Sequence, residues 1–189
     1  SARLVVGGLI TVAGVALVQT RLRGLGRLGT IPLVGTVLAA LLLSACGGAS
    51  TASPCRTVHE TIDPASAIHL LPGAADPVYR TNPPTSGPHQ LTGIASIPRG
   101  VLATPIPGRI QVALLEKGGV LIQYSGPEVA TALGPLAVGQ PLVALAPGVG
   151  LPSPIVVTAW TWKATCASPD PTAIRQFIAT HEGHGPGTP

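Results

Sequence analysis

The chain of 189 residues is 46% hydrophobic but only 3% aromatic, and it contains 24 glycines and 21 prolines. Its 11 basic and 7 acidic residues give a formal net charge of +4, but four of the basic residues and none of the acidic ones precede Cys46. The rest of the chain is therefore neutral. A neutral domain has no basic face to neutralise phosphates, so composition excludes nucleic acid as a partner.

The first apolar stretch, residues 4–18, is interrupted by three glycines and falls short of the roughly 20 residues that comfortably span a bilayer. If it did span, residues 21–27 would form a short cytoplasmic loop, as the positive-inside rule allows. We favour a simpler hypothesis, in which translation starts at Val18, because the chain contains no Met. Residues 19–46 would then be an ordinary signal segment.

The sequence before Cys46 indicates an export signal. Three arginines within residues 21–27 supply a positive n-region, and residues 31–43 form an apolar h-region of fitting length. Leu43-Ser44-Ala45-Cys46 resembles the lipobox of bacterial lipoproteins, in which the cysteine is acylated and the preceding peptide removed. We expect residues 1–45 to be an export segment and acylated Cys46 to anchor the protein to lipid at the extracytoplasmic face of the cell membrane. The alternative is a buried helix ending in an ordinary cysteine.

After this point, residues 46–54 are small and predict a lipidated tether in front of a single domain over residues 55–186. With Cys46 lipidated, Cys55 and Cys166 remain as a pair in a compartment that permits disulfides. A bridge closing so long a loop contributes about 4–5 kcal/mol in the chain-entropy model. Two free thiols or a metal pair are the alternative, which the lack of a Cys-x-x-C spacing disfavours.

The first half of the domain gives few periodic signals. Residues 56–98 contain several prolines and no sustained period, which predicts an extended loop region with one short strand over 67–71. Residues 110–115 and 120–124 are apolar runs separated by Glu116-Lys117-Gly118-Gly119. Because glycine permits positive φ, this arrangement predicts a β-hairpin.

The second half is more regular. Residues 128–133 predict one or two helical turns, residues 142–146 a strand, and residues 155–162 the most β-prone segment of the chain. Asp170-Pro171 predicts a helix with an acidic N-cap and Pro at its first position, ending near Gly183. The predicted fold is a small α+β domain with a β-hairpin, a β-rich core and a C-terminal helix.

A proline-rich run ends at His89. Three prolines and a glycine within residues 83–89 fix a tight, irregular loop. A histidine at the end of such a loop is held in place at low entropic cost, as a metal ligand or catalytic base requires. In a purely structural alternative, Thr85 and Ser86 cap the loop and His89 hydrogen-bonds a backbone group.

Four features follow one another in order: this proline-rich run, Leu115-Glu116-x-Gly118 with residues 120–124, Thr158-Ala159-Trp160, and Cys166. Together they resemble the DUF3105 family, a bacterial extracytoplasmic domain without an established function, over roughly residues 55–186. The residues that carry the resemblance are Tyr79, Pro83, Pro84, Thr85, Ser86, Gly87, Pro88, His89, Glu116, Gly118 and Trp160.

The chain departs from the family at one motif. Members typically read His-x-Leu-Glu-His-Gly where this sequence has Ala113-Leu114-Leu115-Glu116-Lys117-Gly118, so both histidines are absent. If those histidines form a metal or catalytic cluster in the family, this chain keeps Glu116 and His89 and has lost two members.

All five histidines follow Cys46: His59, His69, His89, His181 and His184. Copper and zinc accept imidazole readily, so we expect a site for one of these ions that combines His89 with one or two of the others. His181 and His184 lie three residues apart at a predicted helix end, where both could face one ligand. Surface histidines in a solvated tail or loop are the alternative.

Other chemistry is sparse. The sequence has no Gly-x-Ser-x-Gly elbow, no nucleotide-binding loop and no His-Glu-x-x-His, and no acid is placed to orient a Ser86–His89 pair. We therefore assign no catalytic residue and favour a binding role in the envelope, with metal binding through His89 as the leading version. An envelope enzyme using His89 and Glu116 as an acid/base pair and a structural lipoprotein that binds a protein partner are the alternatives.

Overall fold

The computed structural model describes residues 53–188. The predicted export segment 1–45, the apolar stretch 4–18, the acylated Cys46 and most of the tether lie outside these residues. Within the described part, no helix has the length and apolar character needed to cross a bilayer.

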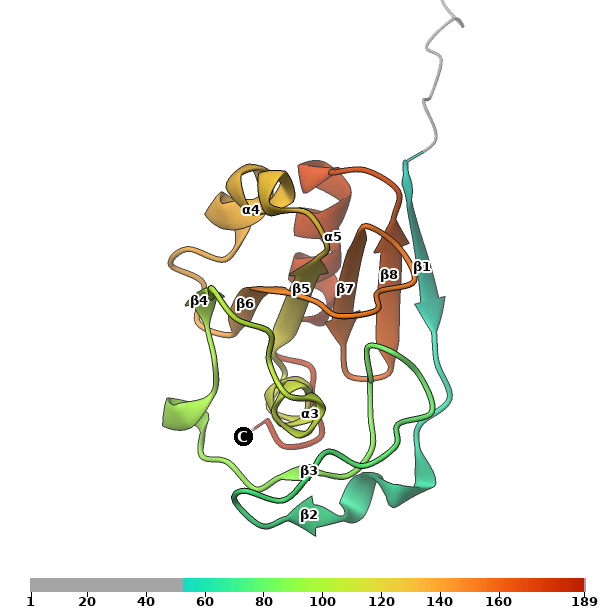
Figure 1. Ribbon diagram of the computed structural model, residues 1–189, viewed down its shortest axis with the longest axis vertical. Helices are drawn as coiled ribbons and strands as arrows, with labels where there is room; N and C mark the ends of the chain where they lie inside the picture. Colours follow the sequence, from blue (N-terminus) through green and yellow to red (C-terminus); the bar gives the residue numbers. More distant parts are fainter. Residues whose placement is uncertain (1–52, 189) are drawn as a thin grey trace, which may run out of the picture. The chain divides into compact units, whose positions relative to one another are not determined.

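The domain is built on a six-stranded mixed sheet with the order β1-β8-β7-β5-β6-β4 (Figure 1). The first four strands in this order pair antiparallel, whereas β6 pairs parallel with both β5 and β4. The strands are β1 (Cys55–His59), β4 (Gly100–Val101), β5 (Val120–Tyr124), β6 (Val143–Pro147), β7 (Ile155–Ala159) and β8 (Trp162–Cys166).

A second, two-stranded parallel sheet pairs β2 (His69–Leu70) with β3 (His89–Gln90). The α-helices are α3 (Gly108–Glu116), α4 (Pro127–Leu133) and α5 (Pro171–His181), and three short 3₁₀ turns occupy Pro64–Ala67, Ile94–Ser96 and Gly134–Leu136. The mixed sheet, the helices and the β7–β8 hairpin confirm the predicted α+β class.

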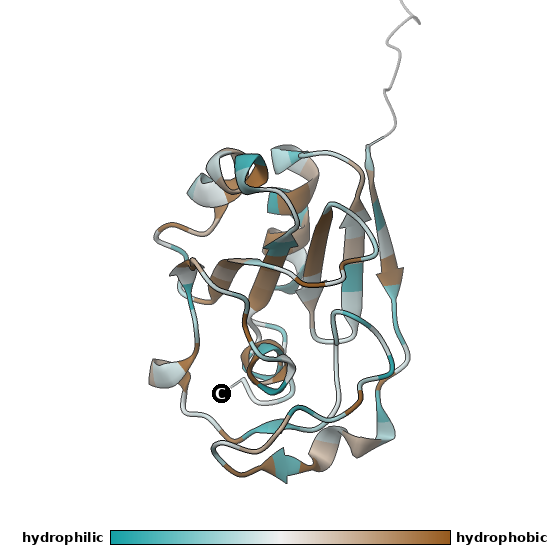
Figure 2. Cartoon of the chain, viewed as in Figure 1, coloured by the Kyte–Doolittle hydropathy of each residue, from teal (hydrophilic) through white to brown (hydrophobic). Residues whose placement is uncertain are grey.

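One face of the large sheet packs against α4 and α5. Ile122 and Val157 on this face belong to one buried cluster with Leu133 of α4 and with Ile174 and Phe177 of α5. Burying each such side chain contributes roughly 1.5–3 kcal/mol. Figure 2 shows the hydrophobic colouring concentrated in the central strands, as expected for strands covered on both sides.

The other face is apolar at one end and polar at the other. Leu121 packs there with Leu114 and Leu115 of α3. Cross-strand partners share a face, and the register pairs Leu121 with Thr158 and Thr158 with Lys163. Buried polar side chains therefore stand beside the apolar cluster, and the proline-rich segment lies over this part of the sheet.

The predicted hairpin over residues 110–124 is wrong. Residues 110–115 belong to α3, and Gly118, with φ +78°, lies just beyond the end of that helix. Its N–H donates to Leu115 O (3.0 Å) and that of Gly119 donates to Leu114 O (2.9 Å), an arrangement typical of a glycine helix stop. Residues 111–115 are all buried and almost all apolar, and a short apolar run of this kind does not distinguish a helix from a strand.

The β-prone segment 155–162 forms two strands instead of one. Strand β7 ends at Ala159, which pairs with Trp162 at the start of β8, so the chain reverses over Trp160 and Thr161. Thr161 adopts φ +60°, which β-branched residues seldom do, and its N–H donates to Thr85 O (3.0 Å). The hairpin of this fold is therefore β7–β8, and its turn is tied to the proline-rich segment.

Residues 56–98 hold more strand than the single one predicted there, because β3 and most of β1 also fall in this range. The other predicted elements are confirmed with small shifts in their bounds. Strands form at 69–70 and 143–147, and α4 covers 127–133. Helix α5 begins at Pro171, with the carboxylate of Asp170 accepting a hydrogen bond from Ala173 N (3.0 Å). Its buried residues Ile174, Phe177 and Ile178 share one face at helical spacing.

The disulfide Cys55–Cys166 is formed, joining β1 to β8 at directly paired positions. It confirms the predicted pairing and links residues 111 positions apart in sequence. Strand β1 contributes only partly buried and exposed residues to the sheet edge, so the bridge adds to a ladder with β8 that buries little side-chain surface.

Glu60 connects the proline-rich segment to the sheet. Its Oε1 pairs with Lys163 Nζ (2.8 Å), and its Oε2 accepts hydrogen bonds from Thr85 Oγ1 (2.7 Å) and Thr81 Oγ1 (3.0 Å). Burial opposes ionisation of Glu60, but the bonds and charge of Lys163 and the two threonine hydroxyls outweigh it and lower the pKa of this carboxyl. The Lys163 side chain is 7% exposed, so Glu60 is the charge that balances a buried ammonium.

Replacing both bridged cysteines, as in Cys55→Ala with Cys166→Ala, should lower the free energy of unfolding by about 2–5 kcal/mol, because the unfolded chain loses its longest constraint. Urea unfolding followed by Trp fluorescence measures this change. Reduced wild-type protein should be destabilised to a similar extent. Free Cys55 and Cys166 thiols in the unreduced, denatured wild type would contradict the pairing.

The Glu60→Gln variant should lose roughly 3 kcal/mol of unfolding free energy at about pH 7, because Lys163 is left buried without a partner charge. The folded-state pKa of Glu60 lies below the ordinary 4.5, so its contribution is present above that value and disappears as pH falls through the folded-state pKa. Urea titrations at about pH 7 and about pH 3 should thus show the variant approaching wild type in acid.

Glu128 is exposed in the first turn of α4 and offers a control. Glu128→Gln should lower the free energy of unfolding by less than about 1 kcal/mol. A difference between wild type and Glu60→Gln that is the same at both pH values would show that the Glu60 charge is not what stabilises the contact.

Candidate metal-binding site

The proline-rich segment is held in place by polar contacts on both sides. Ser86 Oγ accepts a hydrogen bond from Asp63 N (2.9 Å), Thr85 Oγ1 donates to Glu60, and Thr85 O accepts from Thr161 N. Thr85 and Ser86 are 2% and 7% exposed. Both residues therefore have the structural role considered in the sequence analysis, and Ser86 is engaged with backbone instead of being paired with His89.

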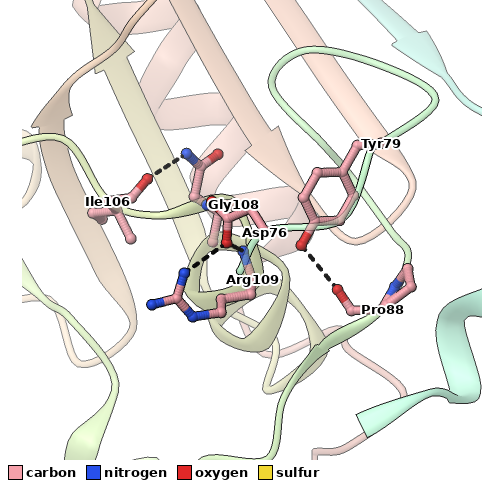
Figure 3. A network of polar contacts seen from close by, with 7 residues as sticks. Asp76, Tyr79, Pro88, Ile106, Gly108 and Arg109 are labelled. Atoms are coloured by element: carbon pink, nitrogen blue, oxygen red, sulfur yellow. Dashed lines mark hydrogen bonds and ion pairs between the residues drawn. The ribbon is translucent and has the colours of Figure 1, made fainter. Parts of the chain in front are cut away.

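Tyr79 supports the same segment through contacts near its end, at Gly87 and Pro88. Its hydroxyl donates to Pro88 O (2.9 Å; Figure 3), and burial raises its pKa, helped by the negative charge of Asp76. A Cβ on Gly87 would lie 3.1 Å from one edge of the Tyr79 ring, and a Cβ on Gly108 only 2.6 Å from the other. Gly87 also adopts φ +131°, so two glycines make room for the ring that supports the residues before His89.

His89 is the buried centre of the candidate site, with 1% of its surface exposed. Its Nδ1 lies 2.9 Å from Gly87 O. A carbonyl oxygen only accepts hydrogen bonds, so Nδ1 carries a proton and donates. The other ring nitrogen, Nε2, is buried without a hydrogen-bond partner and lies 3.5 Å from Glu116 Oε2.

Two further ligand groups lie close to the His89 ring. Parallel pairing of β2 with β3 places His69 directly beside His89, with ring centroids 4.9 Å apart and the rings edge to face. Glu116, the last residue of α3, comes from the helix that packs on β3. One ligand atom from each of the three residues lies within 4.8 Å of the other two. His89 is buried, Glu116 partly buried and His69 exposed, so the cluster opens to solvent at His69.

The cluster already has a protein cation at its edge. Lys117 Nζ lies 3.1 Å from Glu116 Oε2, the same oxygen that faces His89. The chain returns to this helix end near its C-terminus, where Gly187 N donates to Glu116 O (2.9 Å) and Gly183 N donates to Gly118 O (2.8 Å). The carboxylate of Glu116 is thus held between an imidazole and an ammonium group.

The other three histidines have different surroundings. His59 and His181 stack on Trp162, with ring centroids 4.5 and 4.9 Å away, and His184 Nδ1 donates to Thr180 O (2.9 Å). Burial lowers the pKa of His181, and the nearby His184 adds to the effect. Within residues 53–188, the group of metal-ligating side chains that forms is His69, His89 and Glu116, without His59, His181 or His184.

Sequence reasoning named His89 and Glu116 but could not select His69 over the other histidines. The selection depends on a two-residue parallel pairing between segments 20 positions apart, which has no sequence signature of its own. Trp160, also named from the sequence, lies with its ring centroid 6.4 Å from that of His89 and borders the apolar cluster beneath α3.

Comparison with known proteins identifies a family for this chain. A family model described as a protein of unknown function (DUF3105) matches residues 75–189, well over half of the chain. The matched range includes Tyr79, the proline-rich run, Glu116 and Trp160, but begins after His69. Neither the curated proteins nor the solved structures gave a match. On the strength of the family match, this chain belongs to the DUF3105 family.

Proposed function

We propose that this domain binds a copper or zinc ion through His69, His89 and Glu116, and that acylated Cys46 holds it at the extracytoplasmic face of the cell membrane. One observation carries the metal proposal: the Nε2 atom of His89 is buried and unpartnered among ligand atoms within 4.8 Å of one another. Buried polar atoms nearly always have a partner, so an orphaned imidazole nitrogen facing a carboxylate needs an explanation.

The tautomer of His89, with its proton on Nδ1, supports a role as a metal ligand. Metal-binding histidines usually donate their second ring N–H to a carbonyl or carboxylate, which fixes the tautomer and leaves the other nitrogen as the ligand. The bond from Nδ1 to Gly87 O has this form. In the neutral ring, Nε2 and the Glu116 carboxylate are both acceptors and cannot bond each other, whereas a cation between them would bind both.

The spacing suits a small site. Zinc bonds to imidazole nitrogen and carboxylate oxygen are about 2.0–2.2 Å long, so ligand atoms around a tetrahedral ion lie roughly 3.4 Å apart. His89 Nε2 and Glu116 Oε2 are 3.5 Å apart. The side chain of His69 is exposed and free to rotate toward the ion. Three protein ligands would leave a fourth position for water or an exchanging ligand, as in zinc sites that are not purely structural.

Lys117 limits the affinity that such a site would reach. Its ammonium shares Glu116 Oε2 with the proposed ion, so binding requires Lys117 to move away or the like charges to repel each other. A site open to solvent, with three ligands and a competing cation, suits reversible binding of an ion better than its permanent retention.

We expect the full chain in detergent to bind one zinc or copper ion, and His69→Ala to weaken binding by about 10–100-fold, because one of three ligands is lost. His69 is exposed, so this variant should keep the wild-type unfolding temperature. Native mass spectrometry and calorimetric titration measure stoichiometry and affinity. His184→Ala is the matched control and should bind as wild type. Equal binding by all three proteins, or none by the wild type, would refute the site.

The anchor is tested separately. When the protein is produced in cells fed a labelled fatty acid, the wild type should carry the label and fractionate with membranes, whereas Cys46→Ser should carry none. Two acyl chains on one cysteine provide the affinity that stable anchoring requires, so losing them should release the domain or block its maturation. Label retained in Cys46→Ser would place the modification elsewhere.

A further inference from the structure

A hollow elsewhere in the domain has none of the five histidines among its lining residues. It has a volume of about 330 Å³ and lies between the proline-rich segment, the start of α3 and strand β5. Tyr79, Pro84 and Ile106 supply apolar walls, and Gln111 and Gln123 supply amides. This volume is within the range of small-molecule sites, which are mostly apolar with a few convergent polar groups.

Two hydrogen-bond acceptors at this hollow have no partner. Gln111 and Gln123 are only 8% and 2% exposed, and the Oε1 atom of each is buried and makes no hydrogen bond. Gln111 Nε2 donates to Ile106 O (2.7 Å; Figure 3), and this bond fixes which end of its amide is the oxygen. The two residues that carry these orphaned acceptors both line the cavity, which points to a ligand that brings donors.

Gln123 has no evident structural reason to be polar. It lies in β5 among Leu121, Ile122 and Tyr124, in a strand buried along its whole length. Any apolar residue of similar size would fill this position without burying an unpaired amide, and would be expected to stabilise the empty domain. A glutamine at this position therefore lowers the free energy of unfolding of the empty domain, and its amide is available to bond a ligand.

Asp76, which lines the hollow, is neutralised by an ion pair with Arg109. Asp76 Oδ1 pairs with Arg109 Nη1 (2.9 Å) and accepts from Arg109 N (3.1 Å), and Oδ2 accepts from Gly108 N (2.7 Å; Figure 3). Burial opposes ionisation of Asp76, but these bonds outweigh it and lower its pKa, so the pair stays charged and balanced. The hydroxyl of Tyr79 is also occupied, by Pro88 O, which leaves only its ring to contact a ligand.

We propose that this hollow binds a small uncharged molecule with an apolar face and N–H or O–H donors, the donors bonding Gln111 and Gln123 and the apolar face packing on Tyr79 and Pro84. A sugar or a short capped peptide has this chemistry. The site is separate from the metal cluster, since it shares none of His69, His89 or Glu116.

The test uses two probes, N-acetylglucosamine for sugar hydroxyls and N-acetylglycinamide for peptide amides, with saturation-transfer NMR on the full chain. Ligands of this size bind with Kd on the order of 1 mM, so each probe is titrated to about 10 mM. We expect one probe to bind the wild type and Gln123→Leu to bind it at least about tenfold more weakly, with an unfolding temperature equal to or above wild type.

Gln140→Leu is the matched control, because Gln140 is exposed and outside the hollow, and His69→Ala should also bind the probe normally. A readout without variants comes from ¹⁵N-labelled wild type, in which the side-chain amide signals of Gln111 and Gln123 should shift with the probe while that of Gln140 does not. Failure of both probes to bind, or equal binding by Gln123→Leu, would overturn the proposal. A lowered unfolding temperature in Gln123→Leu together with unchanged amide signals in the wild type would assign Gln123 a structural role instead.

Discussion

The hydrogen bond from His89 Nδ1 to the Gly87 carbonyl is the interaction on which the candidate site depends. It fixes the orientation of a ring that is almost completely buried, and it leaves Nε2 as the free nitrogen, which faces Glu116. Gly87 can present its carbonyl in this way because it adopts a positive φ that a side chain would disfavour. The local backbone of the proline-rich run thus determines which nitrogen is available for chemistry.

The same run organises the rest of the second sheet face. Glu60 and the hydroxyls of Thr81 and Thr85 attach it to Lys163, while the ring of Tyr79 fills the space between Gly87 and Gly108. The run thereby contributes to two sites of different character. His89 belongs to the His69–His89–Glu116 cluster, and Pro84 lines the cavity with the two unpartnered glutamines. One rigid segment could in this way hold both an ion and an organic ligand.

Much of the fold and the centre of the site could be predicted from sequence, for identifiable reasons. Cys55 and Cys166 are the only cysteines after Cys46, and Asp170-Pro171 combines two independent helix-start signals. His89 stood out because prolines and a glycine precede it. These are local signals, and each resides in a few adjacent residues.

The sequence predictions that were wrong or incomplete concern features that depend on contacts between residues far apart in the chain. Residues 111–115 are all buried and form an almost continuous apolar run that suits a strand as well as a helix, and the glycine stop of α3 resembles a hairpin turn. His69 joins the cluster only through the β2–β3 pairing, and the importance of Gln123 depends on which side chains surround it. Tertiary contacts supply all three, and a single sequence does not record them.

A crystal structure of the zinc-soaked protein, with anomalous scattering measured at the zinc edge, would show whether an ion binds at His89. We expect one ion about 2.0–2.2 Å from His89 Nε2, with a His69 nitrogen and a Glu116 oxygen completing the protein ligands and Lys117 displaced from Glu116. An ion bound instead by His181 and His184, or an unoccupied cluster with Lys117 still on Glu116, would contradict this expectation.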